Sequence, residues 1–175
     1  MLYKKMAEEE TVFQSSKVSY TGIFSFKDFY AFCYNWLRDE TQISEFSEDK
    51  YSEKLAGDAK NIDIEWTGTR NLTDYFRFKI KVTFTIKNLV QVKVKKEGVE
   101  MDTNKGIVDL KVKGIIVKDY QNKFEMTAFK KTLRGFYEKY IIQPAVKEFK
   151  GKIAADCDEF MTQAKSFLDL EGRRG

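Results

Sequence analysis

The sequence contains no histidine. Histidine is the commonest general base, a frequent metal ligand and the usual switch near neutral pH, so its absence excludes the most familiar catalytic and metal-binding arrangements. The two cysteines, Cys33 and Cys157, are too few for a disulfide framework or a cysteine-based zinc site. Both lie in apolar stripes of predicted helices, where a free thiol acts as a small hydrophobic side chain, with a redox or disulfide role as the alternative. No motif indicates catalysis, a cofactor or a metal, so we expect a non-enzymatic protein.

Long hydrophobic runs are also missing. No stretch of about eighteen apolar residues occurs, which argues against a membrane-spanning helix. The N-terminus lacks the apolar segment of a secretory signal and soon becomes acidic at Glu8, Glu9 and Glu10. We therefore expect a cytoplasmic protein.

The composition favours a single globular domain. The chain has 175 residues, of which 15% are aromatic, so a bulky core or an aromatic-lined cavity is easily built. The formal net charge of +4 is too small by itself to indicate nucleic-acid binding. We expect a mobile arm over residues 1–15, one α+β domain over 16–171 and a frayed tail over 172–175.

The strongest pattern is an unbroken alternation from Tyr75 to Lys87. Even positions are apolar and odd positions after Tyr75 are basic or threonine, which predicts a long strand with one buried face and one charged face. The apolar set is Phe76, Phe78, Ile80, Val82, Phe84 and Ile86. The length of this strand suggests a strongly bent sheet, and Asn88 marks an expected bulge before the alternation resumes at Val90.

Further strands are predicted at 17–24, 61–70 and 107–118, with turns at 96–98 and 103–106. A helix is expected from Ser25, whose side chain is placed to cap it, to about Arg38. Residues 39–60 fit either a short helix followed by a strand or one irregular strand.

The last third of the sequence changes to helical spacing. A helical stretch at 129–141 is followed by Pro144, the only proline, which suits a first helical turn or forces a kink. Beyond it one apolar stripe runs along a helix of about 26 residues. Its members are Val146, Phe149, Ile153, Cys157, Phe160, Ala164 and Phe167. These patterns predict an α+β fold in which a curved antiparallel sheet of about six or seven strands packs against a long C-terminal helix, with one or two short helices after the first strand.

This order of elements, over about residues 17–170, resembles the START-like helix-grip superfamily. The resemblance implies a cavity between sheet and terminal helix that accepts apolar small molecules. Its walls would be Trp66, Phe76, Phe78, Phe84, Phe149, Ile153 and Phe160. The alternative, which the many phenylalanines favour, is that these side chains fill the space as a solid core.

Charged residues offer two candidate surfaces. Lysines on neighbouring strands could form a field for an anion or nucleic acid, although the aromatic residues needed to stack bases lie on the opposite face. These lysines are Lys79, Lys81, Lys93, Lys95, Lys111 and Lys113. We expect Asp63 and Glu65 to oppose the basic positions of the long strand and neutralise them. A second, acidic cluster of Asp156, Asp158 and Glu159 is expected to face solvent on the last helix.

Two classes of function follow. The first is an interaction or structural protein that binds a partner protein or itself through Lys79, Lys81, Lys111 and Lys113 or through Asp156 and Glu159. The alternative is a carrier or sensor of an apolar small molecule held between the sheet and the C-terminal helix. Nucleic acid is not expected as a partner.

Overall fold

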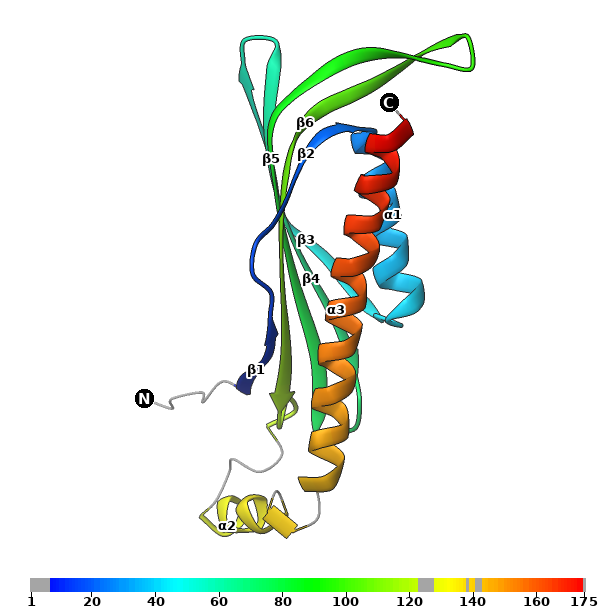
Figure 1. Ribbon diagram of the computed structural model, residues 1–175. Coiled ribbons are helices and arrows are strands. Elements are labelled where there is room, and N and C mark those ends of the chain that lie inside the picture. The colour runs from blue at the N-terminus through cyan, green and yellow to red at the C-terminus, as the bar shows by residue number, and fades with distance from the viewer. Residues whose placement is uncertain (1–6, 123–127, 138, 141–142, 175) are drawn as a thin grey trace.

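The computed structural model describes residues 7–122, 128–137, 139–140 and 143–174. Within these ranges the α+β fold predicted from the sequence is confirmed: a six-stranded antiparallel sheet packs against a long C-terminal helix (Figure 1). The strands are β1 (Glu8–Gln14), β2 (Val18–Phe24), β3 (Glu45–Ala56), β4 (Ala59–Asn71), β5 (Phe76–Lys96) and β6 (Val99–Lys118). The helices are α1 (Phe26–Glu40), α2 (Ala128–Tyr137) and α3 (Gln143–Arg174).

The sheet is an antiparallel meander in which two short strands share one edge. β3, β4, β5 and β6 follow one another in space, while β1 and β2 pair with successive parts of β6. Helices α1 and α3 lie side by side on one face of the sheet, here called the inner face, in a helix-grip-like arrangement (Figure 1). The opposite, outer face carries no helix of the described residues. No helix in the described ranges is long and apolar enough to cross a membrane.

The alternation in β5 places its apolar residues on the inner face. Each of the six predicted core positions from Phe76 to Ile86 is at most 2% exposed. At Asn88 the backbone adopts a φ of 52°, and the pairing with β6 shifts between Lys87 and Val90, so the predicted bulge is confirmed. Beyond it β5 and β6 project past the helices as a hairpin that turns at Glu97 and Gly98, both with positive φ (Figure 1).

Aromatic contacts join α1 to both the sheet and α3. Ser25 caps the helix by accepting a hydrogen bond from the Asp28 N–H, as predicted. Phe29 then packs edge-on against Phe84 of β5, with 5.9 Å between ring centroids. On the other side of α1, Trp36 lies 5.6 Å from Phe160 of α3. α1 is therefore held by core contacts on two sides.

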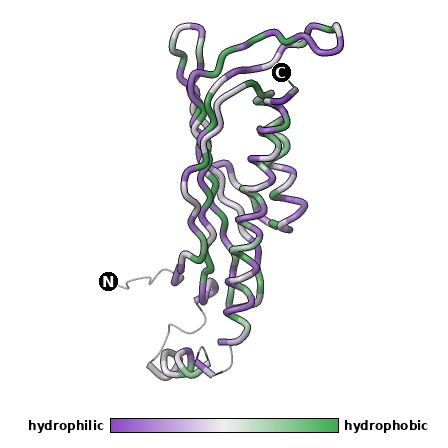
Figure 2. The backbone as a smooth tube through the Cα atoms, in the orientation of Figure 1, coloured by the Kyte–Doolittle hydropathy of each residue, from purple (hydrophilic) through white to green (hydrophobic). Residues whose placement is uncertain are grey.

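Helix α3 is one continuous helix of 32 residues. Pro144 is the second residue of α3, in its first turn, where a missing N–H breaks no helical hydrogen bond, so the proline does not divide the helix. Ile153, Cys157 and Phe160 are fully buried against the sheet. Hydrophobic and hydrophilic stretches alternate along α3 accordingly (Figure 2).

Packed side chains occupy the space between the sheet and α3. Of the seven candidate lining residues, Trp66, Phe76, Phe78, Phe84, Ile153 and Phe160 are at most 2% exposed. Phe149 is half-buried, with its ring 5.9 Å from that of Phe76. A gap beneath α1, next to Phe29 and Phe84, is too narrow to admit a water molecule. The described side chains in this region are thus buried as in a protein core.

Both cysteines are free and buried. Burial raises the pKa of Cys33 well above its usual value and that of Cys157 to about 12. The prediction of thiols that act as small hydrophobic side chains agrees with these surroundings.

Three local predictions need correction, and of the two alternatives for residues 39–60 the irregular strand is found. Residues 8–14 form β1 and are not a mobile arm, because their backbone pairs with β6. Residues 39–60 contain no second helix; β3 is one irregular strand with a bulge between Glu48 and Lys50. The turn expected at 103–106 lies inside β6, where Asn104 pairs with both Gln91 and Phe24. The expected tail at 172–174 continues α3.

The helix predicted at 129–141 is found as α2, which ends at Tyr137. Residues 138, 141 and 142 of that prediction lie outside the described residues, as do residues 1–6 of the expected arm.

Candidate functional site on the outer face of the sheet

Strand register brings three lysines together in the middle of the outer face. Lys81 of β5 lies directly opposite Lys113 of β6, and the next outward pair along the same two strands is Thr83 with Lys111. Lys81 and Lys111 are exposed, and Lys113 is half-buried. We call Lys81, Lys111 and Lys113 the lysine patch.

The acidic residues expected to neutralise these lysines lie elsewhere. The short turn between β4 and β5 fixes Asn71 opposite Arg77, which places Asp63 opposite Thr85 and Glu65 opposite Thr83. The predicted interleaving with Arg77, Lys79 and Lys81 is therefore wrong. Instead both carboxylates lie near Lys50 of β3, at 3.8 Å for Asp63 and 4.0 Å for Glu65.

The carboxylates that border the patch already have partners. Glu9 of β1 pairs with Lys79 at 2.8 Å, so the charge of this predicted site residue is neutralised. Asp49, at the β3 bulge, accepts hydrogen bonds from Thr67 and Ser47, which lower the pKa of its carboxyl group. The charges of Lys81 and Lys79 lower that pKa further. Among the described residues, no member of the lysine patch forms an ion pair.

Asp109 anchors the sheet beside the patch. Its side chain is 8% exposed and lies 2.8 Å from Lys87 Nζ and 3.6 Å from Lys17 Nζ. The hydroxyl of Ser19 also donates to it, so Asp109 joins β2, β5 and β6. The hydrogen bonds from Lys87 and Ser19 lower the pKa of Asp109 to about 2.

Asp109→Asn should therefore reduce the free energy of unfolding at pH 7 by about 1–2 kcal/mol, a value that allows for solvent screening of the half-exposed lysines. Because the folded pKa lies below the unfolded value of 3.8, this stability is present above about pH 4 and is lost as the pH falls towards 2. Urea unfolding of both proteins at several pH values checks this. A difference that persists undiminished at pH 2 would contradict the assignment.

The acidic cluster on α3 does not form one solvated patch. Asp156 is turned towards Arg70 of β4, with 4.0 Å between charged atoms, and its side chain is only 23% exposed. Burial raises the pKa of Asp156, although the charge of Arg70 opposes that shift. The expectation of a fully solvated Asp156 is wrong because Arg70 lies within reach. Glu159 is exposed and accepts a hydrogen bond from Gln163 at 2.8 Å.

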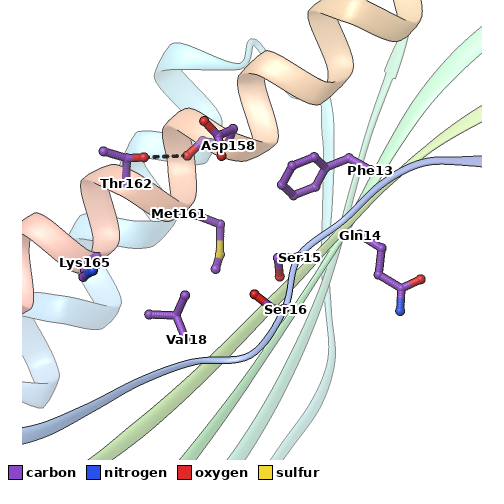
Figure 3. Close-up of a pocket in the computed structure, with 9 residues that line it drawn as sticks. All are labelled: Phe13, Gln14, Ser15, Ser16, Val18, Asp158, Met161, Thr162 and Lys165. Carbon is purple, nitrogen blue, oxygen red and sulfur yellow. Dashed lines mark hydrogen bonds between the residues drawn. The ribbon is translucent and has the colours of Figure 1, made fainter.

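A groove of about 390 Å³ separates α3 from the connection between β1 and β2 (Figure 3). Phe13, Val18 and Met161 supply its apolar side chains, and Asp158 and Lys165 stand on its α3 side (Figure 3). Two serines line its wall, and one of them is committed to structure: the Ser15 N–H donates to Val112 O and the Ser15 hydroxyl accepts from Val112 N–H. Within the described ranges, no base is hydrogen-bonded to the Ser15 hydroxyl.

A second basic site was not indicated by sequence spacing. Its lysines come from separate segments that meet only in the folded chain. They are Lys118, Lys139, Lys147 and Lys150, around a hollow at the end of the sheet near α2. The only local sign is that Lys147 and Lys150 lie three residues apart on α3.

No family model matches this chain, and a search of curated proteins finds no match to it.

Proposed function

We propose that this protein is a non-enzymatic interaction protein that docks an acidic segment of a partner protein on its lysine patch. One observation carries the proposal: Lys81 and Lys113 are directly opposed, Lys111 is beside them, and none forms an ion pair with a carboxylate of the described residues. Like charges that face each other across two strands destabilise a sheet. An acidic partner relieves this repulsion when it binds.

The geometry of the patch fits an extended acidic segment. Lys111 and Lys113 are two positions apart on one strand, so they project from the same face with a spacing of about 6.6 Å. Carboxylates at alternate positions of an extended peptide have the same spacing. The neighbouring residues Thr83 and Thr85 supply hydroxyl groups that can donate hydrogen bonds to such a peptide.

A nucleic acid is a weaker fit for this face. The phenylalanines of β5 are buried on the inner face, so they cannot stack on bases. Three unpaired lysines also supply few phosphate contacts compared with ordinary nucleic-acid surfaces.

The test measures binding of a fluorescent peptide of alternating glutamate and threonine by anisotropy at about 50 mM salt. The variant K81Q/K111Q/K113Q should bind at least tenfold more weakly than the natural protein. The matched control K27Q/K54Q/K95Q removes the same charge from exposed lysines outside the patch and should change affinity less than twofold. Equal losses in the two variants, or binding of a single-stranded oligonucleotide in preference to the peptide, would overturn the proposal.

A second variant separates recognition from stability. Lys113→Glu places a carboxylate opposite Lys81, so urea unfolding should show a gain of about 0.2–1 kcal/mol. The same variant should lose peptide binding. Retained binding would show that the peptide contacts another surface.

The START-like resemblance and the carrier function that it implies stay predictions, as does self-association. The packed side chains between sheet and α3 lend the carrier alternative no support of their own.

A further inference from the structure

Helix α2 lies at one end of the elongated molecule (Figure 1). Leu133, Phe136 and Tyr140 are 43%, 58% and 63% exposed. Leu133 and Phe136 are three residues apart, so they lie on one side of α2. The rings of Phe136 and Tyr140 lie 4.8 Å apart. An aromatic group of this kind at the end of a molecule commonly marks a binding surface.

Two other residues of α2, Arg134 and Tyr137, anchor the helix to the body. The Arg134 guanidinium donates a hydrogen bond to the Tyr75 hydroxyl at 3.0 Å and pairs with Glu8 at 2.7 Å. The ring of Tyr137 packs edge-on against Tyr75, with 6.0 Å between centroids. These contacts hold the helix in place while Leu133 and Phe136 stay exposed.

A basic hollow of about 390 Å³ lies next to this aromatic side. Gly135 and Lys139 border it from the α2 region, and Phe76 and Val146 supply its apolar walls. Lys118, Lys147 and Lys150 complete its lining.

Only part of this positive charge is neutralised. Glu10 pairs with both Lys118 and Lys150, and their hydrogen bonds lower its pKa. Within the described ranges, neither Lys139 nor Lys147 forms an ion pair; Lys139 Nζ lies 5.3 Å from the centre of the Tyr140 ring. The hollow is therefore a site of net positive charge beside exposed aromatic rings.

We propose that this end of the molecule docks on the surface of an anionic lipid bilayer. Amphipathic helices with aromatic and leucine residues on one side and basic residues nearby lie in the interface between lipid head groups and acyl chains. The sequence of α2 itself contains Lys130, Lys131 and Arg134 and no acidic residue. Leu133, Phe136 and Tyr140 enter the interface, while Lys139 and Lys147 attract anionic head groups to the hollow.

The exposed rings alone, or the lysines alone, would fit another ligand. Because the two lie next to each other, a membrane surface fits best. A soluble phosphate ion would use the lysines but leave the rings in water. An apolar protein surface would cover the rings but leave Lys139 and Lys147 without an anion. A bilayer with anionic head groups satisfies both groups at once.

Sedimentation with vesicles tests the proposal. The natural protein should sediment at least fivefold more with phosphatidylcholine vesicles that contain about 30% phosphatidylserine than with phosphatidylcholine alone. F136S/Y140S and K139Q/K147Q should each lose most of this binding. V99S/M101S removes comparably exposed apolar side chains from the distant hairpin, and K27Q/K95Q removes two exposed lysines; both controls should bind as the natural protein does.

This inference is independent of the lysine patch, so K81Q/K111Q/K113Q should still sediment with anionic vesicles. Binding lost in that variant but retained in K139Q/K147Q would overturn the inference and place the lipid on the outer face. Release of the protein from vesicles by millimolar inorganic phosphate at constant ionic strength would also overturn it, since a free anion would then be the ligand. Circular dichroism melting confirms that each variant folds before it is compared.

Discussion

Replacing Trp66 with alanine is expected to lower the free energy of unfolding by about 3–5 kcal/mol. Trp66 is 1% exposed and packs against Phe84, Tyr30 and Phe46, with ring centroids 4.8, 5.0 and 5.3 Å away. Its removal opens a cavity where α1 meets β3, β4 and β5. A loss of this size is a large fraction of the 5–15 kcal/mol that stabilises an ordinary domain.

A polar contact adds to this packing. Trp66 Nε1–H donates to Glu48 Oε2 at 3.0 Å, and the Tyr30 hydroxyl donates to the same oxygen. Burial and the neighbouring Glu48 carboxylate raise the pKa of Tyr30 to about 12. One carboxylate of β3 therefore links α1 to β4. The β3 bulge that follows Glu48 adjusts the strand at this point.

Urea unfolding measures the loss of stability. A second variant, Trp66→Phe, separates the contribution of ring packing from that of the hydrogen bond. The phenylalanine variant keeps most of the packing but loses the hydrogen bond, so it should cost about 1–2 kcal/mol. Leu55→Ala is a control on the adjacent strand, because Leu55 is 76% exposed and should change stability by no more than about 0.5 kcal/mol. Similar losses from Trp66→Ala and Leu55→Ala would show that the aromatic cluster does not hold α1 in place.

Gly114→Val is expected to have the second largest effect, a loss of about 3 kcal/mol or more. A Cβ atom at Gly114 would lie 2.8 Å from Cys157 Sγ and 2.9 Å from Ile153 Cγ2, both on α3. These distances are well inside van der Waals contact, so the helix would have to move away from β6. The glycine is thus required by the close approach of helix and sheet.

A double-mutant cycle tests this contact by urea unfolding. Gly114→Ala alone should cost about 1–3 kcal/mol, and combining it with Cys157→Ala should cost less than the sum of the two single changes. Gly151→Ala is the matched glycine control, on α3. No atom lies near its added methyl group, so it should stabilise the helix by about 0.5–1 kcal/mol. Additive effects of Gly114→Ala and Cys157→Ala would indicate that α3 does not press on β6 there.

Local sequence patterns correctly predicted the elements that bury only one face. The alternation in β5 and the helical spacing in α3 each identify a buried face, because burial of one face imposes the period of the element on its apolar residues. The cap at Ser25 and the bulge at Asn88 were also predicted, since both depend on residues within a few positions. Local chemistry was sufficient in each case.

Strands with few buried side chains, β1 and β3, were predicted poorly. β3 is an edge strand whose side chains are mostly exposed, so its sequence shows little alternation, and the bulge interrupts what remains. β1 begins with three glutamates that would not by themselves favour a strand. Both segments are strands because an existing neighbour, β4 or β6, offers backbone hydrogen bonds.

Residue spacing alone was enough to predict the α+β class, the inner face of β5 and the apolar stripe of α3, because burial of one face gives the apolar residues a regular period. Which charged residues meet could be seen only in the folded chain. The turn between β4 and β5 sets a register that gives Asp63 a threonine opposite it, and the pairing of β5 with β6 puts Lys81 against Lys113. Likewise Lys118, Lys139 and Lys147 come together only through folding. A strand period shows which face a side chain takes, whereas its neighbour depends on register and on long-range packing.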